Sequence, residues 1–262
     1  MYTQTLDSIP IWLLIIIITG LFSIAVELGF RVGKFKHERL EEAENPQVST
    51  ILGASLGLLA FFMAFTFNMA GSRYDARKQL VLDEVNGIET TYLRAQLLPE
   101  PYRTEMRDLL RKYINVRAQL QTANWETVRQ VIAESEELHD LLWSKVVMLS
   151  ENSNYSGVTA LFVRSLNDVF DLHGKRINAG LRNRISISIF LSLYFVAFLA
   201  MAMMGYQAGL NGKRAPIASF ALVLTFAIVM TLITDLERPR QNIFSVSQQA
   251  MVDLKNKVGL KD

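Results

Sequence analysis

The chain has 262 residues, half of them hydrophobic, and carries 27 basic against 25 acidic residues, for a formal net charge of +2. This near balance shows neither the basic surface typical of nucleic-acid-binding proteins nor a polyacidic tail, so we expect no nucleic-acid partner. Because the sequence contains no cysteine, disulfides, thiolate metal sites and thiol nucleophiles are excluded.

The distribution of the apolar residues predicts an integral membrane protein. A helix that crosses the hydrocarbon core needs about 20 mostly apolar residues, because that core is about 30 Å thick. Four segments meet this requirement: 9–30, 51–70, 185–206 and 217–236. No basic residue precedes the first segment and no small-residue cleavage site follows it, so we interpret it as a retained anchor and not as a secretory signal.

The long polar middle of the chain is predicted to be helical throughout. The second apolar segment passes into charged residues with no proline before Pro99, so we expect one long helix that leaves the membrane and continues in water. The predicted fold is therefore an all-α membrane protein, with four transmembrane helices in two pairs flanking a helical extramembrane bundle. The expected domains are the first two spans at 1–71, the bundle at 72–184, the last two spans at 185–236 and a C-terminal extramembrane helix at 237–262.

Phenylalanines stand out in the second predicted span. Phe61 and Phe65 are four residues apart and share a helix face. A ring of such side chains around an axis would form an apolar constriction, which can gate a pore by dewetting. The alternative is that they face lipid or pack between helices, as apolar residues do in any span. Gly53 and Gly57, earlier in the same span, form a small-xxx-small pair that is weak support for self-association.

Several stretches resemble a known family. LLAFFMAFTFNMAGSRYDARKQ at 58–79, followed by VLDEVNGI, resembles the second transmembrane segment of the bestrophins. VELGFRVG (26–33), LRAQLLPEPYR (93–103) and DLERPRQNIFSVSQ (235–248) resemble recurrent pieces of a bacterial bestrophin-like family. The resemblance implies a homo-oligomeric, pentameric ion channel of the bacterial plasma (inner) membrane, in contact with lipid and inorganic ions, whose second span lines the pore. Bestrophins usually show two tryptophans where Arg73-Tyr74 stands here, and the acidic calcium clasp of animal members is missing, so calcium gating is not implied.

The end of the second span carries the predicted pore-mouth residues. The amide of Asn68 could line the mouth, although ordinary interfacial placement is the simpler interpretation. Arg73, Arg77 and Lys78 could form a basic ring that concentrates anions. Membrane-interface anchoring is the commoner use of such residues and stays open as the alternative.

Glu27 and Asp235 are the acidic residues nearest to membrane depth, each about a turn from the end of a predicted span. Ionisable groups at that depth are costly and are functional candidates by default. The structural alternative is an interfacial carboxylate paired with a nearby base, Arg31 for Glu27 and Arg238 for Asp235.

The bundle shows no pattern of catalytic chemistry. Its six glutamates are typical of a solvated face: Glu84, Glu89, Glu105, Glu134, Glu136 and Glu137. The three histidines have no metal-ligand spacing, and no nucleophile elbow, P-loop or dinucleotide fingerprint is present. We therefore expect no enzyme activity, no metal and no cofactor.

Two functions remain compatible with the sequence. One is the ion channel, and the alternative is a non-conducting membrane scaffold or sensor whose bundle binds a partner or ligand. A transporter is disfavoured because the spans lack the Gly/Pro-broken helices that often mark midplane sites. Basic residues flank the spans on both sides and leave the orientation open, while the bestrophin resemblance favours a cytoplasmic bundle.

Overall fold

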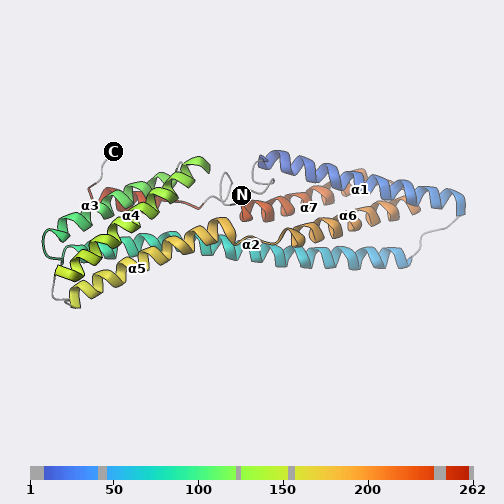
Figure 1. Cartoon of the computed structure of the whole chain (residues 1–262). Helices are drawn as coiled ribbons and strands as arrows, with labels where there is room; N and C mark the ends of the chain where they lie inside the picture. Colours follow the sequence, from blue (N-terminus) through green and yellow to red (C-terminus); the bar gives the residue numbers. More distant parts are fainter. Residues whose placement is uncertain (1–8, 41–45, 122–124, 153–156, 239–245, 260–262) are drawn as a thin grey trace. The chain divides into compact units, whose positions relative to one another are not determined.

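The computed structural model describes residues 9–40, 46–121, 125–152, 157–238 and 246–259, and this part of the chain is all-helical. The α-helices follow one another in the order shown in Figure 1: α1 (Ile11–Leu40), α2 (Pro46–Ala95), α3 (Tyr102–Ala118), α4 (Trp125–Asn152), α5 (Gly157–Ile177), α6 (Ile187–Leu210), α7 (Pro216–Glu237) and α8 (Gln249–Lys257). A 3₁₀ turn at Gln119–Gln121 follows α3, and a π-helical turn at Asn178–Arg182 follows α5. The all-α prediction is confirmed.

Four long helical stretches are apolar enough to cross a membrane: Ile11–Arg39, Pro46–Ala95, Gly157–Leu210 and Pro216–Glu237. They correspond to the four predicted spans, and only the first begins later than predicted, at residue 11 and not at residue 9. The second of them is a single helix of 50 residues, so the predicted continuation beyond the apolar segment is confirmed. It ends before the Pro-Glu-Pro stretch at 99–101, as expected from the missing amide hydrogens of proline.

The chain divides into two compact units. The first contains Met1–Tyr74 and Asn183–Ser245, and the second contains Asp75–Arg182 and Val246–Asp262. Helix α2 contributes its first part to the first unit and its second part to the second unit.

Backbone contact between α1 and α6 organises the first unit, where the two helices lie side by side (Figure 1). Two glycines on each helix face the backbone of the other helix: Gly29 and Gly33 on α1, and Gly205 and Gly209 on α6. A Cβ atom added to Gly205 would lie 1.9 Å from the carbonyl oxygen of Val26. No side chain fits in that space, so close approach of the two helices requires glycine there.

The second unit buries its apolar residues between α3, α4, α5, α8 and the second part of α2. Its core includes Ile88 of α2, Leu110 of α3, Leu142 of α4 and Phe162 of α5, each fully buried. Helix α8 adds Met251, which is also fully buried. The apolar faces that recur every three to four residues in the sequence therefore form one core.

Candidate functional site

The predicted constriction residues lie on an outward face of α2. Phe61 and Phe65 are 62% and 64% exposed, and their ring centroids are 6.3 Å apart. Leu59 and Met63, which alternate with them along the helix, are buried in the core of the first unit. One side of the helix thus packs against the first unit, and the opposite side carries the exposed phenylalanines. These rings are free to contact lipid or another copy of the chain, or to line a pore.

Polar residues continue the face of Phe61 along the same helix. Residues advance by about 100° around a helix, so Asn68, Ser72 and Asp75 fall within roughly 40° of Phe61. All three are exposed. Asp75 was not among the predicted site residues, although its spacing of 14 residues from Phe61 in a helix without breakers would have identified it.

The three basic residues predicted for the pore mouth point elsewhere on α2. Arg73 lies roughly 120° and Arg77 roughly 160° from Phe61, and Lys78 lies about 100° away in the other sense. Arg73 is half-buried, Arg77 is buried at 8% exposed, and Lys78 is exposed. Their role at a pore mouth stays a prediction, and the side chains that share the phenylalanine face are polar and acidic.

Glu27 of α1 forms two ion pairs, one with Arg31, the base expected to pair with it, and one with Arg214, which was not expected. Its carboxylate accepts a hydrogen bond from Nε of Arg31 at 2.9 Å and lies 3.5 Å from Nη2 of Arg214. The Arg214 guanidinium also stacks on the ring of Phe30, 4.0 Å from its centroid. The intramembrane acidic candidate is therefore held between two guanidinium groups.

The second acidic candidate, Asp235, is 1% exposed at the end of α7. Two neighbouring charged residues are also buried and bond the backbone of other segments. Glu237 Oε2 accepts from the backbone amide of Ile185 at 2.8 Å, and Arg238 Nη1 donates to the carbonyl oxygen of Ile9 at 2.8 Å. The end of α7 thus ties the starts of the first and third predicted spans together.

A buried ionic cluster lies in the second unit, and we define it by seven residues: Glu84, Tyr113, Arg117, His139, His173, Arg176 and Gln248. The Glu84 carboxylate, at its centre, is fully buried. Arg117 Nη2 lies 3.0 Å from it, and Arg176 forms a second ion pair with it. The Tyr113 hydroxyl donates a third bond at 3.3 Å. The prediction that the bundle glutamates form a solvated face is therefore wrong for Glu84.

The helical position of Glu84 explains why it is buried. Residues 81, 85 and 88 form an apolar stripe on α2, and Glu84 stands within this stripe. A charge on an apolar helix face requires ionic partners, because an unpaired buried carboxylate would lose its hydration. That signal was present in the sequence, but the partners come from α3 and α5, which sequence spacing does not bring together.

The histidines complete the buried ionic cluster. The ring of His139 lies 4.8 Å from that of His173 and 4.1 Å from that of Phe170, between centroids. Burial, with the positive charge of Arg117, lowers the pKa of His139 to about 4, so the ring is neutral at pH 7. Burial and the Glu84 charge raise the pKa of Tyr113 well above its usual value, which keeps its hydroxyl a donor.

The buried ionic cluster connects helices of the second unit. Arg176 Nη2 also donates to Gln248 Oε1 at 2.9 Å, which connects α5 to the segment before α8. Among the described residues, no group of three or more His, Cys, Asp or Glu side chains is arranged to hold a metal ion. The two histidines that looked scattered in sequence are neighbours, and the charged and polar groups around them include guanidiniums, the Tyr113 phenol and the Glu84 carboxylate.

Comparison with known proteins identifies relatives of this fold. A bacterial bestrophin homologue from Klebsiella pneumoniae, phased with zinc, matches with a TM-score of 0.68 and 16% identity, over 95% of this chain and 97% of that one. A variant of a chain described only as a membrane protein matches with a TM-score of 0.69 and 16% identity, over the same shares. No curated protein sequence is similar enough to count as a relative.

The family assignment rests on the sequence of most of the chain. The family model described as a Bestrophin-like domain matches residues 19–251. This range covers most of the four apolar helical stretches, the exposed phenylalanines of α2 and the buried ionic cluster. The chain therefore belongs to the bestrophin-like family of membrane proteins.

Proposed function

We propose that this protein is a homo-oligomeric ion channel, with five subunits, whose pore is lined by α2. The observation that carries the proposal is the exposed face of that helix. In the apolar segment the face presents Phe61 and Phe65, and beyond it the face presents Asn68 and Asp75. A pore-lining helix needs this arrangement, since an apolar constriction must open into polar surfaces that hold water and ions.

Five copies of α2 around an axis would place ten phenylalanine rings at the constriction. An apolar ring of this kind excludes water when narrow and conducts when it widens by a small rotation of the helices. The side chains of Leu59 and Met63 pack inside each subunit on the opposite side of the helix, so they would set the position of the phenylalanines in the narrow state. The phenylalanines are then the gate, and the first unit is its support.

The charges on α2 indicate which ions would enter. Asp75 follows the phenylalanine face, so five copies would place a ring of carboxylates beside the pore. Rings of acidic side chains favour cations. Arg73, Arg77 and Lys78 lie on other sides of the helix, where they would contact neighbouring helices or the membrane interface around the mouth. We therefore propose cations as the conducted ions.

The remaining parts of the chain have their own places in this proposal. Residues 1–71 and 185–236 form the membrane spans in a bacterial plasma membrane. Residues 72–184 and 237–262 lie outside the bilayer, on the cytoplasmic side. The second unit, with its buried ionic cluster, would form a rigid vestibule through which ions reach the pore.

Reconstitution into planar bilayers tests the function. The purified protein should give discrete conductance steps. In a salt gradient, the reversal potential should shift toward the equilibrium potential of the cation. Mass photometry of the same preparation should give a mass of five subunits. A protein that is monomeric in several detergents, or silent in bilayers, would contradict the channel and favour the scaffold or sensor alternative.

A further inference from the structure

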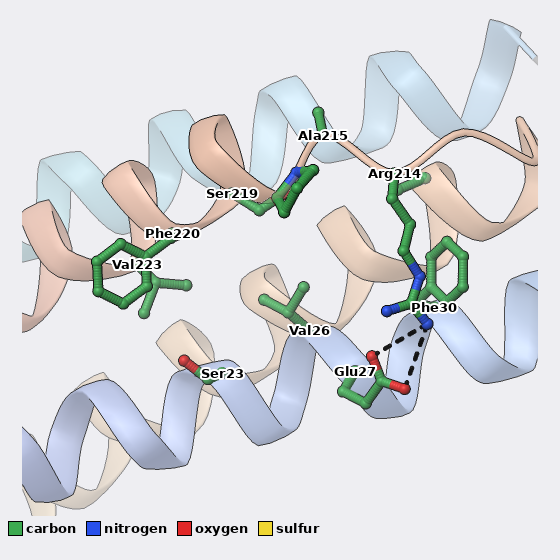
Figure 2. Close-up of a pocket in the computed structure, with 11 residues that line it drawn as sticks. Ser23, Val26, Glu27, Phe30, Arg214, Ala215, Ser219, Phe220 and Val223 are labelled. Carbon is green, nitrogen blue, oxygen red and sulfur yellow. Dashed lines mark hydrogen bonds and ion pairs between the residues drawn. The ribbon is translucent and has the colours of Figure 1, made fainter.

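A pocket opens in the first unit between α1, the end of α6 and the start of α7, with a volume of about 190 Å³. Figure 2 shows Glu27 and Phe30 of α1 facing Arg214, with Val26 and Val223 farther along the helices. Ser23, Ser219 and Phe220 also line the pocket. No residue of α2 lines it, so the pocket is separate from the face proposed for the pore.

The pocket is charged at one end and apolar at the other. Its charged end is formed by Arg214, in the link between α6 and α7, with Glu27 and Phe30. From there the lining extends along α7 from Pro216 to Val223, a distance of roughly 10 Å at 1.5 Å per residue. The long direction thus follows the spanning helices, with its charged end at the end of a span where lipid headgroups lie.

Together with Arg31, which lies beside Glu27 but outside the lining, the charges at this end leave an excess of one positive charge. Glu27 is paired with both Arg31 and Arg214, so one carboxylate faces two guanidinium groups. The ion pair with Glu27 uses Nη2 of Arg214, and the Arg214 side chain is 59% exposed. Stacking on Phe30 holds the guanidinium plane at the pocket's mouth. A single negative charge with oxygen acceptors complements this arrangement.

We propose that the pocket binds one anionic phospholipid. Its phosphodiester accepts hydrogen bonds from Arg214, and the upper part of an acyl chain lies against Val26, Phe220 and Val223. A zwitterionic headgroup fits less well, because its ammonium group needs a carboxylate and Glu27 already has two cationic partners. The lipid would contact both α1 and α7, at the end of the pocket that lies next to the link between α6 and α7.

Native mass spectrometry of the delipidated protein in detergent tests this binding. Dioleoyl phosphatidylglycerol, dioleoyl phosphatidylethanolamine and inorganic phosphate are each titrated into it. We expect phosphatidylglycerol to bind with a defined stoichiometry of one per subunit, and phosphatidylethanolamine to bind about tenfold more weakly. Inorganic phosphate should give no stable complex, because it leaves the apolar part of the pocket empty.

Two variants remove the site in different ways, each with a matched control. Arg214→Gln removes the phosphodiester donor, and Lys213→Gln removes the same charge from the neighbouring residue, which does not line the pocket. Ser219→Leu fills the apolar part, and Thr225→Leu makes a similar change on an exposed position of α7 outside the lining. Both site variants should weaken phosphatidylglycerol binding by about tenfold, while both controls should bind like the wild type.

The proposal fails on any of several results. Equal losses for Arg214→Gln and Lys213→Gln would mean unspecific attraction to a basic surface. If Ser219→Leu bound phosphatidylglycerol as tightly as the wild type, the acyl chain would not lie in the pocket. Phosphate binding as tight as that of the lipid would identify a site for a free anion. Thermal melts of all four variants identify any loss of folding, and retained lipid binding by either site variant overturns the assignment.

Discussion

The fully buried Glu84 carboxylate offers the sharpest stability prediction. Glu84→Gln keeps the size of the side chain and removes its charge, so the guanidiniums of Arg117 and Arg176, 2% and 11% exposed, lose their counter-charge. Breaking a buried ion pair by removing one partner costs about 3–5 kcal/mol. Since 1.4 kcal/mol corresponds to a factor of ten, the population of the open form of the second unit should rise by a factor of about 10² to about 4 × 10³.

Native-state hydrogen exchange measures this population directly. The slowest amides of α3 and α5 should exchange faster by that factor in Glu84→Gln. Glu89→Gln is the matched control, because Glu89 stands on the same helix and pairs with Lys257 at the surface, where an ion pair contributes about 0–1 kcal/mol. Exchange in the control should rise no more than about fivefold. If Glu84→Gln exchanges no faster than Glu89→Gln, the buried ionic cluster does not stabilise the second unit.

Three further predictions concern packing, pH and ion preference. Gly205→Ala should destabilise the first unit by about 1–3 kcal/mol in a thermal melt, because the new methyl meets the Val26 carbonyl oxygen, whereas Gly53→Ala, with open space around it, should cost nothing measurable. Acidification from pH 6.5 toward pH 4 should destabilise the second unit, since folded His139 stays neutral while unfolded His139 takes up a proton. This contribution is complete above pH 6.5, and His139→Phe should reduce the acid destabilisation without abolishing it, because His173, whose pKa is lowered to about 3, contributes in the same sense. Asp75→Asn should move the reversal potential in a salt gradient toward zero if five carboxylates select cations, and an unchanged potential would contradict that role.

Sequence reasoning succeeded where local physics decides the structure. The long apolar segments became helices, and Pro99 and Pro101 separated α2 from α3, because proline lacks the amide hydrogen that a helix interior requires. The face shared by Phe61 and Phe65 also follows from the helical repeat alone, once the absence of breakers makes α2 a single helix.

Contacts between residues from distant parts of the chain could not be predicted from the sequence. In the sequence, Gly53 and Gly57 are weak support for self-association, and a Cβ atom added to either one would meet nothing of the same chain within 4 Å, so their role between copies stays a prediction. The close contact within the chain joins Gly29 with α6 and Gly205 with α1, which stand far apart in the sequence. A glycine pattern shows that close approach is possible, and only the fold decides which helix approaches.

Single-channel recording tests whether Phe61 and Phe65 form the constriction of a pore. Single-channel conductance is recorded in planar bilayers for the wild type and for the double variant Phe61→Ala, Phe65→Ala.

Two other exposed phenylalanines of the same helix, changed as Phe62→Ala, Phe67→Ala, serve as the control off the pore face. We expect a larger conductance or altered rectification for the first variant only, because a wider apolar ring has a lower dewetting barrier. Its thermal stability should stay near that of the wild type, since both rings are more than half exposed and avoid the roughly 3–5 kcal/mol cost of truncating a buried phenylalanine. A first variant that is destabilised and silent, or a control that changes conductance equally, would contradict the account.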